Sequence, residues 1–286
     1  MKLLSHARRV TILNIALNAV LFVLKLFAGL ASNSIAVLAD AANSFMDTFH
    51  GCATYWAVKE SHKKADKGHQ FGHGRAEPMV AFFISLLMAI TAFEFLRSAI
   101  ISLSGNGEVR VINWTIIGVL VIAILAKVLL SYEAGKAGER TRSPALKATA
   151  ADARNDVLIT LTALFGLAVS ATAYVWMDEV AAILISVFIF WQAFRIGKEN
   201  VDYLVGAAPS PELQRKIGEI ATTVRGVRGL SLVKAHYVGS FVHVEVHISV
   251  NRHISTAASH HIAMTVENDL EELPEVDKAF VSVEPV

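Results

Sequence analysis

Residues 34–58 read SIAVLADAANSFMDTFHGCATYWAV, a mostly apolar stretch that also contains Asp40, Asn43 and Asp47. At about 1.5 Å rise per residue, a helix of this length crosses the roughly 30 Å of hydrocarbon in a bilayer. Ionisable side chains are costly inside a membrane and generally mark a pathway or a binding site. The stretch therefore predicts a membrane-spanning helix that carries functional polar groups.

Five further stretches share this length and apolar character, so the sequence predicts an α-helical membrane domain of six transmembrane helices over residues 1–208. Hydrophobic residues make up 54% of the 286 residues and charged residues only 18%, and the mean hydropathy is +0.49. Soluble domains are usually less apolar and about 25% charged, so a disordered chain is excluded and an ordinary soluble enzyme is disfavoured. The predicted spans are residues 10–32, 34–58, 79–103, 111–132, 149–173 and 179–203.

The distribution of charge predicts the orientation in the membrane. Basic residues gather at the N-terminus and in the loops after the second and fourth spans, whereas the other three loops contain only Arg110. Because Lys and Arg collect on the cytoplasmic side, we expect both termini in the cytoplasm. The net charge of +1 argues against a nucleic-acid partner. The single cysteine, Cys52, excludes an intrachain disulfide and a Cys₄ zinc site.

Residues 209–286 are more polar and are predicted to form a small cytoplasmic α+β domain with the order α-β-β-α-β. Alternating strands and amphipathic helices can be placed from their periodicity and from their flanking Pro, Ser and Gly residues. A domain of about 78 residues is near the lower limit for an independent core, so we expect it to dimerise. The predicted elements are a helix capped by Ser210 with Pro211 at its first position, strands over 230–235 and 242–250 separated by Gly239-Ser240, a helix over 255–273 and a strand over 279–283.

Two pairs of polar residues lie four positions apart within predicted spans: Asn43 with Asp47, and Asp152 with Asp156. Each pair lies on one helix face, about one turn apart. Two such pairs facing each other would surround a divalent cation with four oxygen-bearing side chains. Three carboxylates at close range repel one another unless a cation or protons are bound, which would couple metal binding to proton release.

A structural role is the alternative for these acids, because an intramembrane Asp can simply pair with a cation. Cationic side chains in the predicted spans that could form such pairs include Lys25, Arg97, Lys127 and Arg154. Asp40 lies seven residues before Asp47 on the same face. Asp40 has two possible interpretations: an intermediate binding position on the ion pathway, or a buried hydrogen-bonding group.

The loop after the second span contains a second candidate site. Asp66, His69 and His73 fall within eight residues of one another, and glycines at 68, 72 and 74 allow tight wrapping. Imidazole and carboxylate together suit zinc-like ions. The alternative is a set of solvated loop histidines.

Residues 209–286, called the tail below, offer a third candidate site. His243 and His247 share one face of a predicted strand, His260 lies on the second tail helix, and Glu284 follows the last strand. A metal-sensing cluster and a histidine-rich polar surface are both consistent with this pattern.

The sequence resembles the cation diffusion facilitator family of divalent-metal/proton antiporters over essentially its whole length. Three motifs carry the resemblance: LADAANSFMD at 38–47, FGHGRAEP at 71–78 and ADARND at 151–156. The α-β-β-α-β tail is similar to the family's cytoplasmic domain, which dimerises. The resemblance implies a secondary active transporter rather than an enzyme. Such a transporter exports a divalent metal from the cytoplasm by alternating access, driven by inward proton flow.

The resemblance places the transport site at Asn43, Asp47, Asp152 and Asp156. Zinc-transporting members usually have a histidine at the position of Asp152. The oxygen-only set is similar to that of manganese-exporting members, and oxygen ligands favour Mn²⁺ over Zn²⁺. We therefore expect Mn²⁺ as the preferred substrate within a range that includes Fe²⁺, Zn²⁺, Cd²⁺ and Co²⁺.

The resemblance also maps a loop site onto Asp66, His69 and His73. A tail site maps only in part, onto His247, His260 and Glu284, because Ser231 and Ser282 stand where the family has histidines. These sites imply Mn²⁺ or Zn²⁺ as a regulator as well as a substrate. The family further implies a homodimer in the lipid bilayer, with protons as counter-ion. The short tail and the lack of a long histidine-rich loop favour a prokaryotic inner membrane, and the charge balance predicts no nucleic-acid partner.

Three alternative functions differ from this metal/proton antiporter in substrate or in the class of protein. They are a zinc/cadmium exporter of the same family, an intramembrane aspartyl hydrolase built on two aspartates, and a membrane metal sensor. The paired i, i+4 sets and the accessory histidine site favour transport over the last two.

Overall fold

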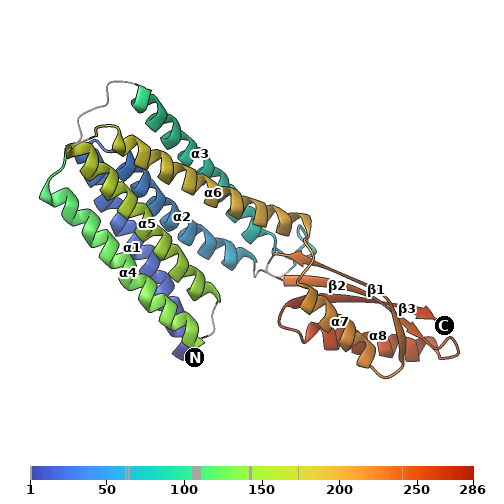
Figure 1. The fold of residues 1–286 in the computed structure, drawn as a ribbon. Coiled ribbons are helices and arrows are strands. Elements are labelled where there is room, and N and C mark those ends of the chain that lie inside the picture. Colours follow the sequence, from blue (N-terminus) through green and yellow to red (C-terminus); the bar gives the residue numbers. More distant parts are fainter. Residues whose placement is uncertain are drawn as a thin grey trace. The chain divides into compact units, whose positions relative to one another are not determined.

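The structure is a computed structural model that describes residues 2–61, 63, 65–104, 111–141, 144–172, 174–239 and 241–286 (Figure 1). The chain divides into two compact units. The first comprises residues 1–53 and 83–196, and the second comprises residues 54–82 and 197–286.

Each of the six predicted spans lies largely within a long helix. Most of these helices extend beyond the apolar stretch, because polar residues at either end continue the helix. They are α1 (Lys2–Ser32), α2 (Ile35–Ser61), α3 (Ala76–Ser104), α4 (Trp114–Thr141), α5 (Pro144–Thr172) and α6 (Met177–Val205).

Among the described residues, five of these helices are long and apolar enough to cross a membrane: α1, α3, α4, α5 and α6. Large apolar side chains such as Phe27, Leu129 and Phe165 remain more than 60% exposed on them, as expected where lipid covers the surface. The helix α2 has 27 residues and is long enough, but its polar side chains lower its mean hydropathy. Length and composition therefore support a helical membrane domain with five spans, one fewer than the six expected.

Small residues bring α4 and α5 close together in the first unit. Their contact is a buried cluster made largely of alanines, which lets the helix backbones approach closely. The hydroxyl of Ser131 on α4 also donates to the carbonyl of Ala150 on α5 at 3.0 Å. The cluster comprises Leu130, Ala134, Ala137, Leu146, Ala150 and Ala153.

A carboxylate from α6 holds the start of α2. Ser34 caps the helix, since its hydroxyl accepts the backbone N–H of Val37 at 3.0 Å and donates to Asp178 Oδ1 at 2.5 Å. The other oxygen of Asp178 accepts the N–H of Ile35 at 2.8 Å. A negative charge at a helix N-terminus satisfies unpaired N–H groups and opposes the positive end of the helix dipole. Asp178, which is fully buried, thereby fixes where α2 begins.

The tail has the predicted order α-β-β-α-β. Strand β1 pairs antiparallel with β2, and β2 pairs parallel with β3. Ser210 and Ser255 cap the two helices as N-caps. Gly239 of the predicted turn has a φ of +66°, which glycine tolerates, and Ser240 lies outside the described residues. The elements are α7 (Pro211–Thr223), β1 (Val227–Val238), β2 (Phe241–Val250), α8 (Thr256–Glu271) and β3 (Val276–Pro285).

The two faces of β2 have different surroundings. Val244, Val246 and Ile248 are buried in one core with residues of α7 and α8 such as Ile217 and Leu270. Successive side chains of a strand point to opposite faces. The intervening residues of β2, which include His243 and His247, therefore point away from the two helices.

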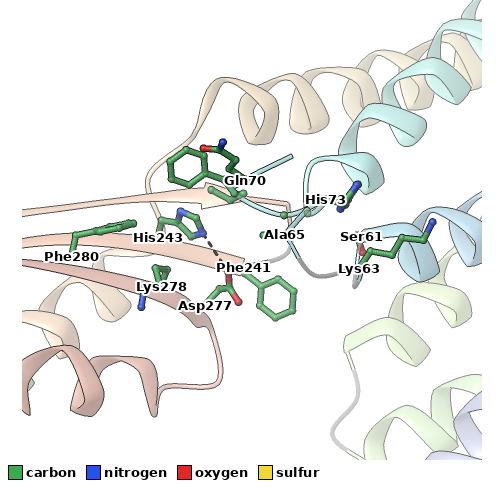
Figure 2. Close-up of a pocket in the computed structure, with 14 residues that line it drawn as sticks. Ser61, Lys63, Ala65, Gln70, His73, Phe241, His243, Asp277, Lys278 and Phe280 are labelled. Atoms are coloured by element: carbon green, nitrogen blue, oxygen red, sulfur yellow. Dashed lines mark ion pairs between the residues drawn. The ribbon is translucent and has the colours of Figure 1, made fainter. Parts of the chain in front are cut away.

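A cavity of about 590 Å³ lies within the second unit, on the side of the sheet opposite α7 and α8 (Figure 2). Residues of the loop between α2 and α3, including Phe71 and His73, line it together with His243 and Asp277 of the tail. His243 Nε2 lies 3.4 Å from Asp277 Oδ2. The side chain of His243 is largely buried there although it points away from the helices.

We expect Asp178→Ala to lower the stability of the protein by about 1–2 kcal/mol, the usual range for losing a helix cap that also carries charge. Asp178→Asn keeps an oxygen acceptor and should lose less. The measurement is the apparent unfolding temperature of the detergent-solubilised protein. An Asp178→Ala variant as stable as the wild type would contradict this account of the α2 N-terminus.

Candidate metal sites

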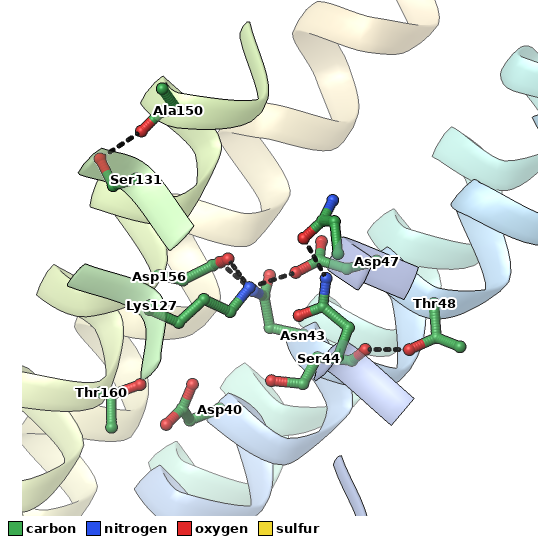
Figure 3. Close-up of polar contacts among 12 residues, drawn as sticks. Asp40, Asn43, Ser44, Asp47, Thr48, Lys127, Ser131, Ala150, Asp156 and Thr160 are labelled. Carbon is green, nitrogen blue, oxygen red and sulfur yellow. Dashed lines mark hydrogen bonds and ion pairs between the residues drawn. The ribbon is translucent and has the colours of Figure 1, made fainter. Parts of the chain in front are cut away.

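The two i, i+4 pairs meet through one contact between α2 and α5. The side-chain amide of Asn43 donates to Asp156 Oδ1 at 2.9 Å (Figure 3). Both residues are buried, with 3% and 6% exposure. The other end of the amide, Asn43 Oδ1, is buried without a hydrogen-bond partner among the described residues. A carbonyl oxygen in this state is a ready ligand for a hard cation.

The ammonium of Lys127, on α4, lies among these oxygens. It forms a close ion pair with Asp156 Oδ2 and lies 3.8 Å from Asp47 Oδ2, as Figure 3 shows. The side chain is only 1% exposed. The structure thus brings Asn43, Asp47 and Asp156 together around a buried cation.

Asp152 lies one helical turn before Asp156 on α5 and makes none of these contacts. The carboxylates of Asp47, Asp152 and Asp156 do not all come within 4.8 Å of one another in the described part of the chain. Sequence reasoning named Lys127 only as one of four available cations. Its position in the middle of an apolar span was the signal that could have singled it out.

Asp40 belongs to a separate buried network. Lys25 Nζ donates to Asp40 Oδ1 at 2.7 Å, to Thr160 Oγ1 at 2.9 Å and to Ser44 Oγ at 3.2 Å. Lys25 and Asp40 are both fully buried. This favours the second interpretation of Asp40, a buried hydrogen-bonding group, and the network joins α1, α2 and α5.

The loop site gathers its three predicted residues. Ligand atoms of Asp66, His69 and His73 all lie within 4.8 Å of one another, and no other group of three or more His, Cys, Asp or Glu side chains does so among the described residues. Asp66 Oδ2 lies 3.3 Å from His73 Nε2. Backbone N–H groups of His69 and Gly68 donate to Asp66 Oδ1 at 2.7 and 2.8 Å. These bonds lower the pKa of Asp66, so the group is held as a carboxylate, the form that binds metal.

The tail site is only partly gathered. His247 Nδ1 lies 3.2 Å from Glu284 Oε1, and His247 Nε2 lies 3.2 Å from Glu245 Oε1. Hydrogen bonding to Glu245 and Glu284 raises the pKa of His247. The hydroxyl of Ser231 donates to Glu284 Oε2 at 2.7 Å and, with His247, lowers the pKa of Glu284.

His260 does not join His247 and Glu284 within this chain. It lies on α8, which packs on the face of the sheet formed by Val244, Val246 and Ile248. His247 points to the other face. The spacing of histidines along the sequence did not reveal on which face the helices pack.

Both parts of the chain match known protein families. Residues 11–205 match the model described as the cation efflux transmembrane domain, and residues 209–286 match that of the cation efflux protein, cytoplasmic domain. An uncharacterized transporter of Methanocaldococcus jannaschii is 34% identical over 275 residues, covering 96% of this chain and 97% of that protein.

Relatives with a named metal or pump activity are more distant. The manganese efflux system protein MneS of Bacillus subtilis is 29% identical over 278 residues, covering 96% of this chain and 94% of that protein. The cation-efflux pump FieF of Pectobacterium atrosepticum is 28% identical over 270 residues, covering 93% and 89%. With one family model matched along residues 11–205, the chain belongs to the cation efflux family of transporters, the cation diffusion facilitators.

Proposed function

We propose that this protein exports a divalent transition-metal cation, preferably Mn²⁺, from the cytoplasm in exchange for protons. The observation that carries the proposal is the buried contact between Asn43 of α2 and Asp156 of α5. A shared cation site requires that the helices bearing the two i, i+4 pairs meet at those residues. Asn43 Oδ1, which has no hydrogen-bond partner in the described part of the chain, adds an oxygen ligand at the same place.

We further propose that α2 is the sixth membrane span. Two of the polar side chains that lower its mean hydropathy are buried against other helices, Asp40 against Lys25 and Asn43 against Asp156. Polar groups paired inside a bundle are tolerated at membrane depth. With residues 1–208 forming six spans and the basic loops inside, both termini and the domain of residues 209–286 lie in the cytoplasm. A prokaryotic inner membrane fits this arrangement.

Oxygen donors support Mn²⁺ as the preferred substrate. The proposed ligands are the carboxylates of Asp47, Asp152 and Asp156 and the amide oxygen of Asn43, and such ligands suit harder ions than imidazole does. The similarity to a manganese efflux protein points the same way. A zinc or cadmium exporter of the same family is the alternative, because ligand geometry and surrounding groups also tune metal choice.

In the proposed cycle, the metal enters from the cytoplasm between α2 and α5 and displaces protons from the carboxylates. The metal-loaded form then rearranges to face outward. Protons reload the carboxylates there and release the metal. Clustered carboxylates support such an exchange, because bound protons and a bound cation relieve the same repulsion.

The remaining proposed metal sites are regulatory. Asp66, His69 and His73 would hold a divalent ion at the loop between α2 and α3, and His247 with Glu284 would supply two ligands in the tail. The domain of residues 209–286 would join two copies of the chain as a homodimer. Its match to the family's cytoplasmic domain supports this role.

A transporter accounts for the membrane acids better than an aspartyl hydrolase does. A hydrolase needs two carboxylates that share a proton. Here a cation, the ammonium of Lys127, faces the carboxylates of both Asp47 and Asp156, an arrangement that a proton-sharing pair does not need.

Asp47→Ala and Asp156→Ala should each lower metal-driven proton flux in proteoliposomes by about tenfold or more, since even outer-shell partners of metal ligands cost roughly 10–100-fold when replaced. Glu133→Ala removes an exposed acid from α4 and should transport like the wild type. Flux retained in either aspartate variant would show that the site is assigned to the wrong residues.

Asp152→His should shift transport from Mn²⁺ towards Zn²⁺, raising the ratio of Zn²⁺ to Mn²⁺ flux by roughly tenfold, because imidazole suits zinc better than manganese. Asp152→Asn keeps an oxygen ligand and should leave the ratio near that of the wild type. Both ratios can be measured by uptake of the two metals into inverted vesicles. An unchanged ratio in Asp152→His means that ligand type does not set the metal preference.

A further inference from the structure

The buried lysine at the proposed transport site has no role in the cycle described above. Lys127 lies on α4, whereas the proposed ligands lie on α2 and α5. Its ammonium nevertheless pairs with Asp156 and lies 3.8 Å from Asp47. With 1% exposure it is shielded from water, so the carboxylates are its charge partners.

The second buried lysine, Lys25, shows what a structural lysine looks like in the same bundle. Its ammonium donates to three acceptors, of which only Asp40 is charged. None of the three is a proposed metal ligand. Lys127 differs because both carboxylates that it faces are proposed ligands.

Each oxygen of Asp156 already faces one donor, which leaves one lone pair on each. Oδ1 accepts from the amide of Asn43, and Oδ2 pairs with Lys127. A metal ion cannot approach Oδ2 while the ammonium remains there, because two cations at this distance repel strongly in a water-poor site. Binding of metal at Asp156 therefore requires that Lys127 withdraw.

We propose that Lys127 is a tethered resident cation, which occupies the transport site in its metal-free state and must be displaced by the incoming ion. This inference rests on the proposed function, because it takes Asp47 and Asp156 as the ligands. Lys127 sets the apparent affinity of the site by competing for the same carboxylates.

The competition also selects for charge. A monovalent ion that replaces the ammonium of Lys127 brings no additional positive charge to the site. It also competes with an ammonium that the chain keeps close to the carboxylates. A divalent ion adds one unit of charge to a cluster of carboxylates and is favoured by that difference. Lys127 thereby excludes monovalent cations from the site.

The experiment measures equilibrium binding of radioactive Mn²⁺ to the full-length protein in detergent. All variants carry His69→Ala, His73→Ala and His247→Ala, so that the loop cluster and the tail site contribute no binding. Lys127→Gln should bind Mn²⁺ about tenfold more tightly, the size of a typical coupling between two bound groups. Lys127→Arg keeps the charge and should bind no more tightly than the wild type. Lys136→Gln removes an exposed cation from the same helix; it is the control and should not tighten binding.

A second readout tests charge selection. An excess of K⁺ should weaken Mn²⁺ binding to Lys127→Gln more than to the parent protein, with N-methylglucamine at equal ionic strength as the control. A merely structural role for Lys127 would not produce this difference. If Lys127→Gln does not give monodisperse protein, Lys127→Met takes its place. Tighter Mn²⁺ binding by Lys127→Arg, without tighter binding by the uncharged variant, overturns the proposal.

Asp156→Ala in the same background distinguishes the proposed role of Lys127 from the proposed transport site. Loss of Mn²⁺ binding in Asp156→Ala, together with unchanged or weaker binding in Lys127→Gln, overturns the role of Lys127 and leaves the transport site standing. Undiminished binding in Asp156→Ala overturns the transport site itself.

Discussion

The carboxylate of Asp156 is the group on which the arrangement of the membrane helices depends. It accepts from Asn43 of α2 and pairs with Lys127 of α4, while itself belonging to α5. A buried charge without partners would be very costly in this setting. The need to neutralise a single buried acid therefore fixes how three helices pack against one another, and the proposed binding site lies where they meet.

The same requirement explains other contacts between the helices. Lys25 and Asp40 neutralise each other between α1 and α2, and Asp178 of α6 satisfies the N-terminus of α2. Apolar side chains cannot specify which helices are neighbours in lipid, because lipid is as apolar as they are. Polar pairs can, since each buried polar group needs a neighbour of matching charge or hydrogen-bonding capacity. The polar residues of α2 thus specify its neighbours, and some of them are also the proposed metal ligands.

Most helices and strands could be predicted from the sequence, whereas the contacts between elements at the candidate sites could not, for one common reason. Apolar length predicted the six long helices, and capping serines with strand alternation predicted the tail. Spacing within one element placed Asn43 beside Asp47 on a face. Partners from other elements were not predictable in this way: Lys127 between Asp47 and Asp156, or His260 across the sheet from His247. Residue spacing reports which side chains share a face, but not what packs against that face.

The ion pair between Lys25 and Asp40 has a consequence for how the chain enters a membrane. A helix as polar as α2 inserts poorly alone, but α1 and α2 are joined by only Asn33 and Ser34. With α2 as the proposed sixth span, they can enter as a helical hairpin in which the charges of Lys25 and Asp40 cancel. The hairpin stays incomplete until Thr160 of α5 and Asp178 of α6 have been synthesised. The packing of α1 and α2 therefore depends on helices that are synthesised later. In a chain truncated before α5, the polar groups of α2 would lack these partners.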